Sequence, residues 1–207
     1  MSIIVHHLNN SRSQRILWML EELKLPYEIK HYERDSKTML APPALRKIHP
    51  LGKSPVLEDG GLKLVETGAI CEYLVAKTGQ LGAPDDGDGL VRYRQFMHYA
   101  EGSVMPVLLL LLVLNRIPLM GKLAVKKVQP MADVHLDYIE RELASRPWFA
   151  GDTMSAADIM MSFPLEAAAS RAGLNESRPA TMAWLRKVHE RSAYQTALSK
   201  GGEYAYA

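Results

Sequence analysis

Cysteine is almost absent from this sequence of 207 residues. The single Cys71 excludes an intramolecular disulfide, a Cys-x-x-Cys redox pair and a cysteine-rich zinc site. A charge excess of one sign is also absent, because 25 Lys and Arg residues face 23 Asp and Glu residues and leave a formal net charge of +2. We therefore do not expect a nucleic-acid binder that draws its affinity from a dense basic face.

Long hydrophobic runs are absent as well. The longest uninterrupted apolar run, Val107–Leu114, is well short of the roughly 20 residues that span a bilayer. The first ten residues contain no basic stretch followed by an apolar core of about 7–15 residues, so we expect no secretory signal. With 47% hydrophobic and 23% charged residues, the composition is typical of a soluble globular protein. We expect a cytoplasmic protein without a membrane span.

The composition changes once along the chain, at residues 79–89, where glycine, proline and aspartate cluster as in a linker. Before it, alternation and helical spacing predict strands at 3–5, 27–32, 56–58 and 62–65, and helices at 11–23, 42–48 and 66–77. After it, nearly every segment has helical period. We therefore predict an α/β domain at 1–78, the linker at 79–89 and an all-helical domain at 90–207.

Two prolines, Pro106 and Pro130, lie inside predicted helices of the second half of the chain. We expect a helix over 90–114 kinked at Pro106, and a helix over 123–143 interrupted at Pro130. Further helices are predicted after the Ser155–Asp158 capping box, at 179–190 and at 193–198. We interpret Val107–Leu114 as buried core, and the tail at 201–207 has no strong helix signal.

The segment after the first strand begins Ser11-Arg12-Ser13-Gln14, which has the Ser-x-x-Gln form of a capping box. This spacing predicts that Ser11 is the helix N-cap and accepts a backbone N–H, while its own proton stays free. For the neighbouring residues we expect structural or simple roles: His6 and His7 structural or exposed, Arg12 and Arg15 solvated, Cys71 a small buried filler.

Four segments carry a resemblance that runs along essentially all of the chain. In chain order, they are SRSQRILWMLEEL from Ser11, HPLGKSPVL from His49, ETGAI from Glu66, and the cap at Ser155–Asp158. In this order and on these elements, they resemble the cytosolic glutathione transferase superfamily, in particular bacterial members with a serine in the N-terminal motif. The resemblance implies a thioredoxin-like N-terminal domain followed by an all-helical C-terminal bundle.

The resemblance also implies a glutathione site in the first domain, with glutathione as co-substrate and no metal. It implies that Ser11 stabilises the glutathione thiolate, and that a cis Pro55 presents the backbone of Ser54 to the cysteinyl part of the tripeptide. Glu66 and Thr67 are then expected to hold the γ-glutamyl end.

Two further assignments follow from the resemblance. Lys53 is placed to pair with the glycyl carboxylate of the tripeptide. The pocket for the electrophile is expected in the helical domain, where Tyr99, Met105 and Arg116 are the candidate lining residues. A homodimer is expected from the family, with the tyrosine- and methionine-rich helix after the linker as a candidate apolar patch.

The chemistry required of Ser11 is modest. A thiol with pKa about 8.5 is only about 3% ionised at pH 7, and lowering its pKa by two units takes about 2.7 kcal/mol. A hydrogen bond to a charged group supplies about 1.5–3 kcal/mol. One hydroxyl at a helix start is therefore sufficient to lower the pKa of the glutathione thiol by about two units. Asn10, Asn9 or a backbone N–H remain alternative donors to the sulfur.

We predict a glutathione transferase that adds the tripeptide sulfur to small hydrophobic electrophiles, with glutathione peroxidase activity as a side reaction. The alternative is a non-catalytic module of the same fold that binds apolar ligands or protein partners. Cys71 lies in the helix after the hairpin instead of at the start of the first helix, which counts against a thiol-reductase activity.

Overall fold

The computed structural model describes residues 2–85 and 87–206. The chain forms two compact units: the first contains residues 2–80 together with His189–Ala205, and the second contains Leu81–Val188 together with Tyr206. The units divide between residues 80 and 81, within the predicted linker 79–89, and residues 87–89 of that segment are already helical. Residues 189–205, predicted as part of the helical domain, belong to the first unit.

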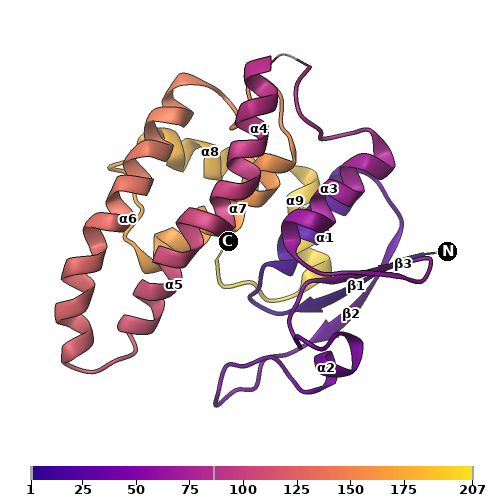
Figure 1. Ribbon diagram of the computed structural model, residues 1–207, viewed down its shortest axis with the longest axis horizontal. Coiled ribbons are helices and arrows are strands. Elements are labelled where there is room, and N and C mark those ends of the chain that lie inside the picture. Colours follow the sequence, from indigo (N-terminus) through magenta and orange to yellow (C-terminus); the bar gives the residue numbers. More distant parts are fainter. Residues whose placement is uncertain (1, 86, 207) are drawn as a thin grey trace. The chain divides into compact units, whose positions relative to one another are not determined.

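The first unit is a four-stranded sheet with helices. Its elements are β1 (Ile3–Leu8), α1 (Ser13–Glu22), β2 (Tyr27–Tyr32), α2 (Ala44–Ile48), β3 (Val56–Asp59), β4 (Leu62–Leu64), α3 (Thr67–Thr78) and α9 (Ser192–Gly201). The strand order is β2-β1-β3-β4, with β1 parallel to β2 and antiparallel to β3. The predicted thioredoxin-like order of elements is confirmed (Figure 1).

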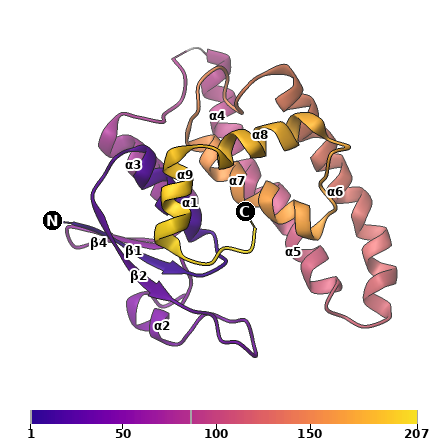
Figure 2. The same cartoon turned by 180° about the vertical axis from the view of Figure 1, so that it is seen from behind.

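The last helix of the chain, α9, packs against α1, the first helix (Figures 1 and 2). Trp18 and Tyr194 meet edge to face with ring centroids 5.5 Å apart. Arg191 forms an ion pair with Glu22, from Nε to Oε1 over 2.5 Å. Because these contacts join residues about 170 positions apart in sequence, helical periodicity alone gives no sign of them.

In the described part of the second unit, the regular structure is helical apart from an isolated bridge between Trp148 and Gly151. Its elements are α4 (Gly87–Tyr99), the π-helix η1 (Ala100–Val104), α5 (Met105–Leu114), α6 (Met120–Ser145), α7 (Ala156–Arg171) and α8 (Pro179–His189). A π-helical turn directly precedes Pro106, which occupies the first turn of α5. The predicted interruption at Pro130 is wrong, because α6 continues through this proline.

The core of the second unit is centred on α7. Its predicted capping box is confirmed: the buried Asp158 carboxylate accepts the backbone N–H groups of Phe149 (3.0 Å) and Ser155 (2.9 Å). Burial raises the pKa of this carboxyl to about 6, although the hydrogen bonds act in the opposite direction. The expectation that all of Val107–Leu114 is core is wrong, since Leu109 and Leu110 face solvent while their neighbours on α5 contact α6 and α7.

Candidate functional site

The predicted glutathione-binding residues of the first unit gather at one end of its sheet. Strand register places them there, because His6 of β1 lies opposite Val56 of β3, and Leu57 of β3 lies opposite Leu64 of β4. The end of β1, the start of β3 and the end of β4 therefore lie at the same end of the sheet, which we call the site edge. The segments with Ser11, Ser54 and Thr67 all adjoin the sheet at the site edge.

Ser11 is buried in the turn between β1 and α1. Its Oγ accepts the backbone N–H of Ser13 over 3.2 Å and lies 2.8 Å from Ser13 Oγ. The predicted capping box is wrong in detail: α1 begins at Ser13 with Arg12 at the N-cap, and within residues 2–85 and 87–206 neither polar atom of the Gln14 side chain has a hydrogen-bond partner. Ser11 thus caps the first turn without reciprocal help from Gln14.

A histidine extends this pair of hydroxyls into a chain. His7 is buried, its Nδ1 lies 2.9 Å from Ser13 Oγ, and its ring also hydrogen-bonds the Gly201 backbone of α9. That second bond raises the His7 pKa, as expected when a ring N–H donates to a carbonyl, but burial and His31 lower the pKa to about 4. His7 is therefore neutral at pH 7, with the proton on Nε2 and a lone pair on Nδ1.

The tautomer of His7 decides which group donates in each hydrogen bond that links His7, Ser13 and Ser11. Ser13 has one hydroxyl proton, and we infer that it donates to the lone pair on His7 Nδ1, 2.9 Å away, in preference to the Leu8 carbonyl, 3.3 Å away. Ser13 Oγ then accepts from the Leu8 backbone N–H, 3.2 Å away, and from the Ser11 hydroxyl. With this direction, the Ser11 proton points toward Ser13 and has to turn before it can meet a sulfur, whereas the capping pattern predicts a free proton; that expectation stays a prediction.

The asparagines before Ser11 are held by other parts of the first unit. Asn9 Oδ1 accepts the Arg34 backbone N–H over 3.0 Å, and Asn10 Oδ1 accepts the Ala205 backbone N–H over 2.7 Å. Asn10 has a left-handed backbone with φ of 50°. Its carboxamide oxygen is thus fixed by the C-terminal tail, while its NH2 end remains a donor and keeps Asn10 as the alternative to Ser11.

The loop before β3 contains the predicted cis peptide bond between Ser54 and Pro55. The Ser54 hydroxyl donates to the His6 carbonyl of β1 over 2.7 Å, which ties this loop to the strand that leads to Ser11. Lys53 next to it is exposed, so its ammonium extends into solvent.

The start of α3 combines a strained residue with a buried one. Glu66 is exposed and has φ of 69° and ψ of 118°, a region that non-glycine residues rarely occupy. Thr67 is buried, and its Oγ1 accepts a hydrogen bond from Arg15 Nη2 over 3.3 Å. The expectation that Arg15 is solvated is wrong, because only 1% of it is exposed. A buried cation therefore lies directly behind Thr67.

Cys71 takes no part in this arrangement. It is fully buried in α3, and burial raises the pKa of its thiol to about 12. A thiol in this environment stays protonated and unreactive at neutral pH, as expected for a structural filler. Among the described residues 2–85 and 87–206, no group of three or more His, Cys, Asp or Glu side chains is arranged to hold a metal ion.

The three candidate electrophile-pocket residues occupy different environments in the second unit. Tyr99 is half-buried, and its hydroxyl hydrogen-bonds His135 Nδ1 over 2.6 Å. Burial raises the pKa of Tyr99 to about 12, so it remains a neutral phenol. Met105 is packed in the core and Arg116 is exposed beyond the end of α5. Only Tyr99 presents a polar group that is both oriented and partly accessible.

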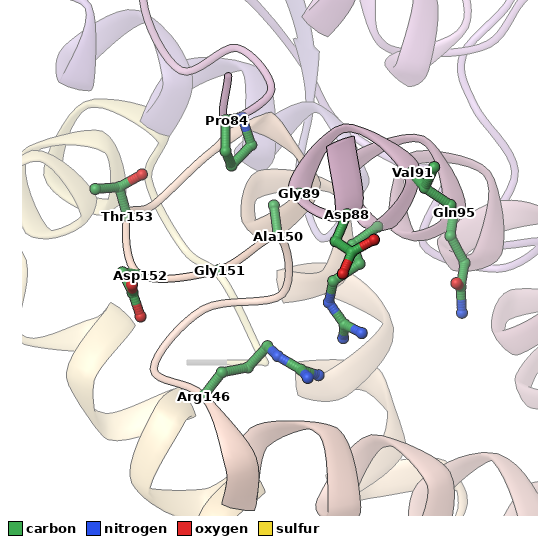
Figure 3. Close-up of a pocket in the computed structure, with 11 residues that line it drawn as sticks. Pro84, Asp88, Gly89, Val91, Gln95, Arg146, Ala150, Gly151, Asp152 and Thr153 are labelled. Atoms are coloured by element: carbon green, nitrogen blue, oxygen red, sulfur yellow. The ribbon is translucent and has the colours of Figure 1, made fainter. Parts of the chain in front are cut away.

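A cavity of about 600 Å³ lies elsewhere in the second unit, between α4 and the loop that follows α6 (Figure 3). Its lining includes Arg92 and Arg146, which both form ion pairs with Glu142. Asp88 and Asp152 also line it. The two cations are thus already neutralised, and none of the predicted site residues lines this space.

The fold and the site together define a class of protein: a thioredoxin-like unit with a serine, a cis-proline loop and a helix start on one edge, joined to a helical unit. Family models agree, since residues 2–76 match the N-terminal domain and residues 104–192 the C-terminal domain of glutathione S-transferases. The chain belongs to the glutathione S-transferase family.

Individual relatives support this membership. Glutathione S-transferase 3 of Schizosaccharomyces pombe is 40% identical over 96% of this chain and 87% of its own length. A solved glutathione S-transferase from Actinobacillus pleuropneumoniae has a TM-score of 0.87 at 32% identity, covering 96% of this chain and 92% of that one. A glutathione transferase from Burkholderia graminis, solved with two glutathione molecules bound per subunit, has a TM-score of 0.80 at 25% identity over 95% and 87% of the two chains.

Sequence reasoning missed three residues of this edge, namely His7, Ser13 and Arg15. A signal for His7 was present, because it alternates with the buried Val5 along β1 and must point to the same face of the sheet. No local signal identifies Ser13 or Arg15, since their environments are set by residues from other elements.

Proposed function

We propose that this chain catalyses the addition of the glutathione thiol to small hydrophobic electrophiles. In the displacement of an aryl halide, a carbon–sulfur bond forms, the carbon–halogen bond breaks, halide leaves with the electron pair, and the thiol proton passes to solvent. The observation that carries this proposal is the buried Ser11 hydroxyl at the edge shared with the cis Ser54–Pro55 loop and Thr67.

Each predicted binding residue has a role that its position supports. Ser11 donates a hydrogen bond to the thiolate, and the backbone of Ser54 pairs with the cysteinyl unit. Glu66 and Thr67 hold the γ-glutamyl end, helped by the buried positive charge of Arg15 behind Thr67. Lys53, which is exposed, pairs with the glycyl carboxylate.

The gain from thiolate formation alone is limited. A fall of about two pKa units makes the thiolate roughly 25-fold more abundant at pH 7 but lowers its nucleophilicity by about 10-fold. Most of the acceleration therefore comes from holding the electrophile beside the sulfur, where effective molarity contributes several kcal/mol. Among the three candidate residues for binding the electrophile, Tyr99 is the one with an oriented and partly accessible polar group.

The proposal is tested by binding to immobilised glutathione and by conjugation of an activated aryl halide. We expect Ser11→Ala to keep glutathione binding and to reduce turnover at neutral pH by up to about 10-fold, because the thiolate loses the difference between a charged and a neutral hydrogen bond, about one pKa unit. Unchanged turnover in this variant moves the role to Asn10 or a backbone N–H. Absence of glutathione binding at millimolar concentration in calorimetry favours the non-catalytic module instead.

Three finer expectations belong to the same proposal. A peroxidase side activity is measured with an organic hydroperoxide and glutathione. We expect a homodimer, which sedimentation equilibrium tests. We also expect a cytoplasmic location, which fractionation of cells that express the chain tests.

A further inference from the structure

The connection between α5 and α6 exposes large apolar side chains. Leu119 is 84% exposed, Met120 is 70% exposed and Leu123 is 59% exposed, and Val113 and Ile117 beside them also face solvent. These five residues form the end of the α5–α6 pair, which we call the hairpin tip (Figures 1 and 2). Single exposed apolar residues are common on proteins, but a contiguous group marks an interaction site.

The charges at the hairpin tip have one sign. Between Glu101 and Asp133 the sequence contains no acidic residue. The charged residues in this stretch are all basic and all exposed: Arg116, Lys122, Lys126 and Lys127. The rest of the chain has 23 acidic residues against 21 basic ones, so the basic excess of the protein is concentrated at this tip.

We propose that the hairpin tip docks this protein onto the surface of an anionic membrane. Apolar side chains flanked by lysine and arginine are the combination that lies in the headgroup region of a bilayer, with the apolar groups inserted and the cations near lipid phosphates and carboxylates. Leu119 and Met120 supply the inserted groups. Arg116 and Lys122 flank them on either side in the sequence.

The tip docks on the bilayer and does not cross it. An 18-residue window within the continuous helix Gly87–Leu114 has a mean hydropathy of 1.7 and is 39% buried. However, Phe96 and Met97 of this helix are buried in the second unit, where α4 packs against α7. Surface docking through the tip preserves this packing, whereas insertion of the helix would destroy it.

A second copy of the chain is a poorer occupant for this surface. A twofold interface pairs a patch with its own copy, which would bring four basic side chains of one tip against the same four of the other. Like charges set against each other disfavour association. An anionic lipid surface has the opposite charge and complements the tip.

The test is sedimentation of the full chain with vesicles. We expect binding to vesicles of phosphatidylcholine with one third phosphatidylserine, weak binding to pure phosphatidylcholine, and release at high salt, which screens these charges. Lys122→Gln with Lys126→Gln should weaken binding about 25-fold, at about fivefold per basic residue. Lys37→Gln with Lys47→Gln, which removes two exposed lysines of the first unit, is the matched control and should bind as the unaltered chain does.

The apolar contribution has its own pair of variants. Leu119→Ser should weaken vesicle binding, while Leu40→Ser, which removes a leucine that is 67% exposed in the first unit, should not. Equal binding to both lipid mixtures, or an unchanged Lys122→Gln/Lys126→Gln variant, overturns the proposal. So does a tip variant that converts a dimer into a monomer in sedimentation equilibrium, because the tip then belongs to a second copy. Glutathione binding by each variant shows that it is folded.

Discussion

Removing the Ser11 hydroxyl and removing the neighbouring Ser13 hydroxyl should shift the pKa of the bound glutathione thiol in opposite directions. Ser11 is proposed to donate to the thiolate, but the direction inferred from His7 turns its proton toward Ser13 Oγ, 2.8 Å away, when no ligand is bound. Binding of the thiolate therefore exchanges a neutral hydrogen bond, worth about 0.5–1.5 kcal/mol, for a charged one worth about 1.5–3 kcal/mol. The difference is about 1–1.5 kcal/mol in favour of the thiolate, or about one pKa unit.

Ser11→Ala removes this gain, so the pKa of the bound thiol should rise by about one unit. In Ser13→Ala, the Ser11 hydroxyl no longer has to give up its hydrogen bond to Ser13 before it donates to the thiolate. Donation to the thiolate then becomes more favourable by about 1 kcal/mol. The pKa of the bound thiol should then fall by about 0.7 units. At a pH well below the pKa of the bound thiol this gives about fivefold more thiolate, and the lower nucleophilicity offsets about twofold of that gain.

The assay is a pH titration of the ultraviolet absorbance of the glutathione thiolate in the complex. Ser170→Ala, which removes a hydroxyl that bonds the Ala167 carbonyl of its own helix, is the control and should leave the titration unchanged. The His7 and Leu8 partners of Ser13 lose a hydrogen bond in Ser13→Ala, so its stability is measured separately by urea unfolding. A bound-thiol pKa that rises in Ser13→Ala would refute the assigned direction of the hydrogen-bond chain.

The remaining predictions concern strain, pH and burial. Glu66→Gly should raise the free energy of unfolding by about 1 kcal/mol, because glycine accepts the φ of 69°, and should weaken glutathione binding in calorimetry. The folded pKa of His7 is about 4 against 6.5 unfolded, so the unfolded chain binds more protons between these values. His7 therefore makes stability rise with pH by about 3 kcal/mol across that window, and His7→Asn should remove this rise from urea titrations at several pH values. Asp158→Ala should cost about 2–4 kcal/mol, since it leaves buried N–H groups of Phe149 and Ser155 without an acceptor; a loss below 1 kcal/mol in the same titrations would contradict this.

Local patterns predicted most of the fold. The alternation over 27–32 corresponds to β2, and the glycine pair at 60–61 joins β3 to β4 as expected, with positive φ at both glycines. The capping box at Ser155 marks the start of α7 correctly. Each of these signals depends on residues within a few positions of one another, which is why a single sequence is sufficient to detect them.

What could not be predicted depends on contacts between distant segments. Arg15 looks like a surface residue on an early helical turn, and its burial results from Thr67, which is 52 positions away. The membership of α9 in the first unit depends on contacts such as Arg191 with Glu22. The direction of the Ser11 proton depends on the tautomer of a histidine that bonds the backbone of α9. Residue types were visible in the sequence, but their partners were not.

A crystal structure of the complex with glutathione would show which group meets the sulfur. We predict the cysteinyl sulfur within hydrogen-bonding distance of Ser11 Oγ, the cysteinyl backbone paired with Ser54, and the γ-glutamyl group at Glu66 and Thr67. A sulfur that contacts the Asn10 carboxamide or a backbone N–H, with Ser11 still directed to Ser13, would contradict this prediction.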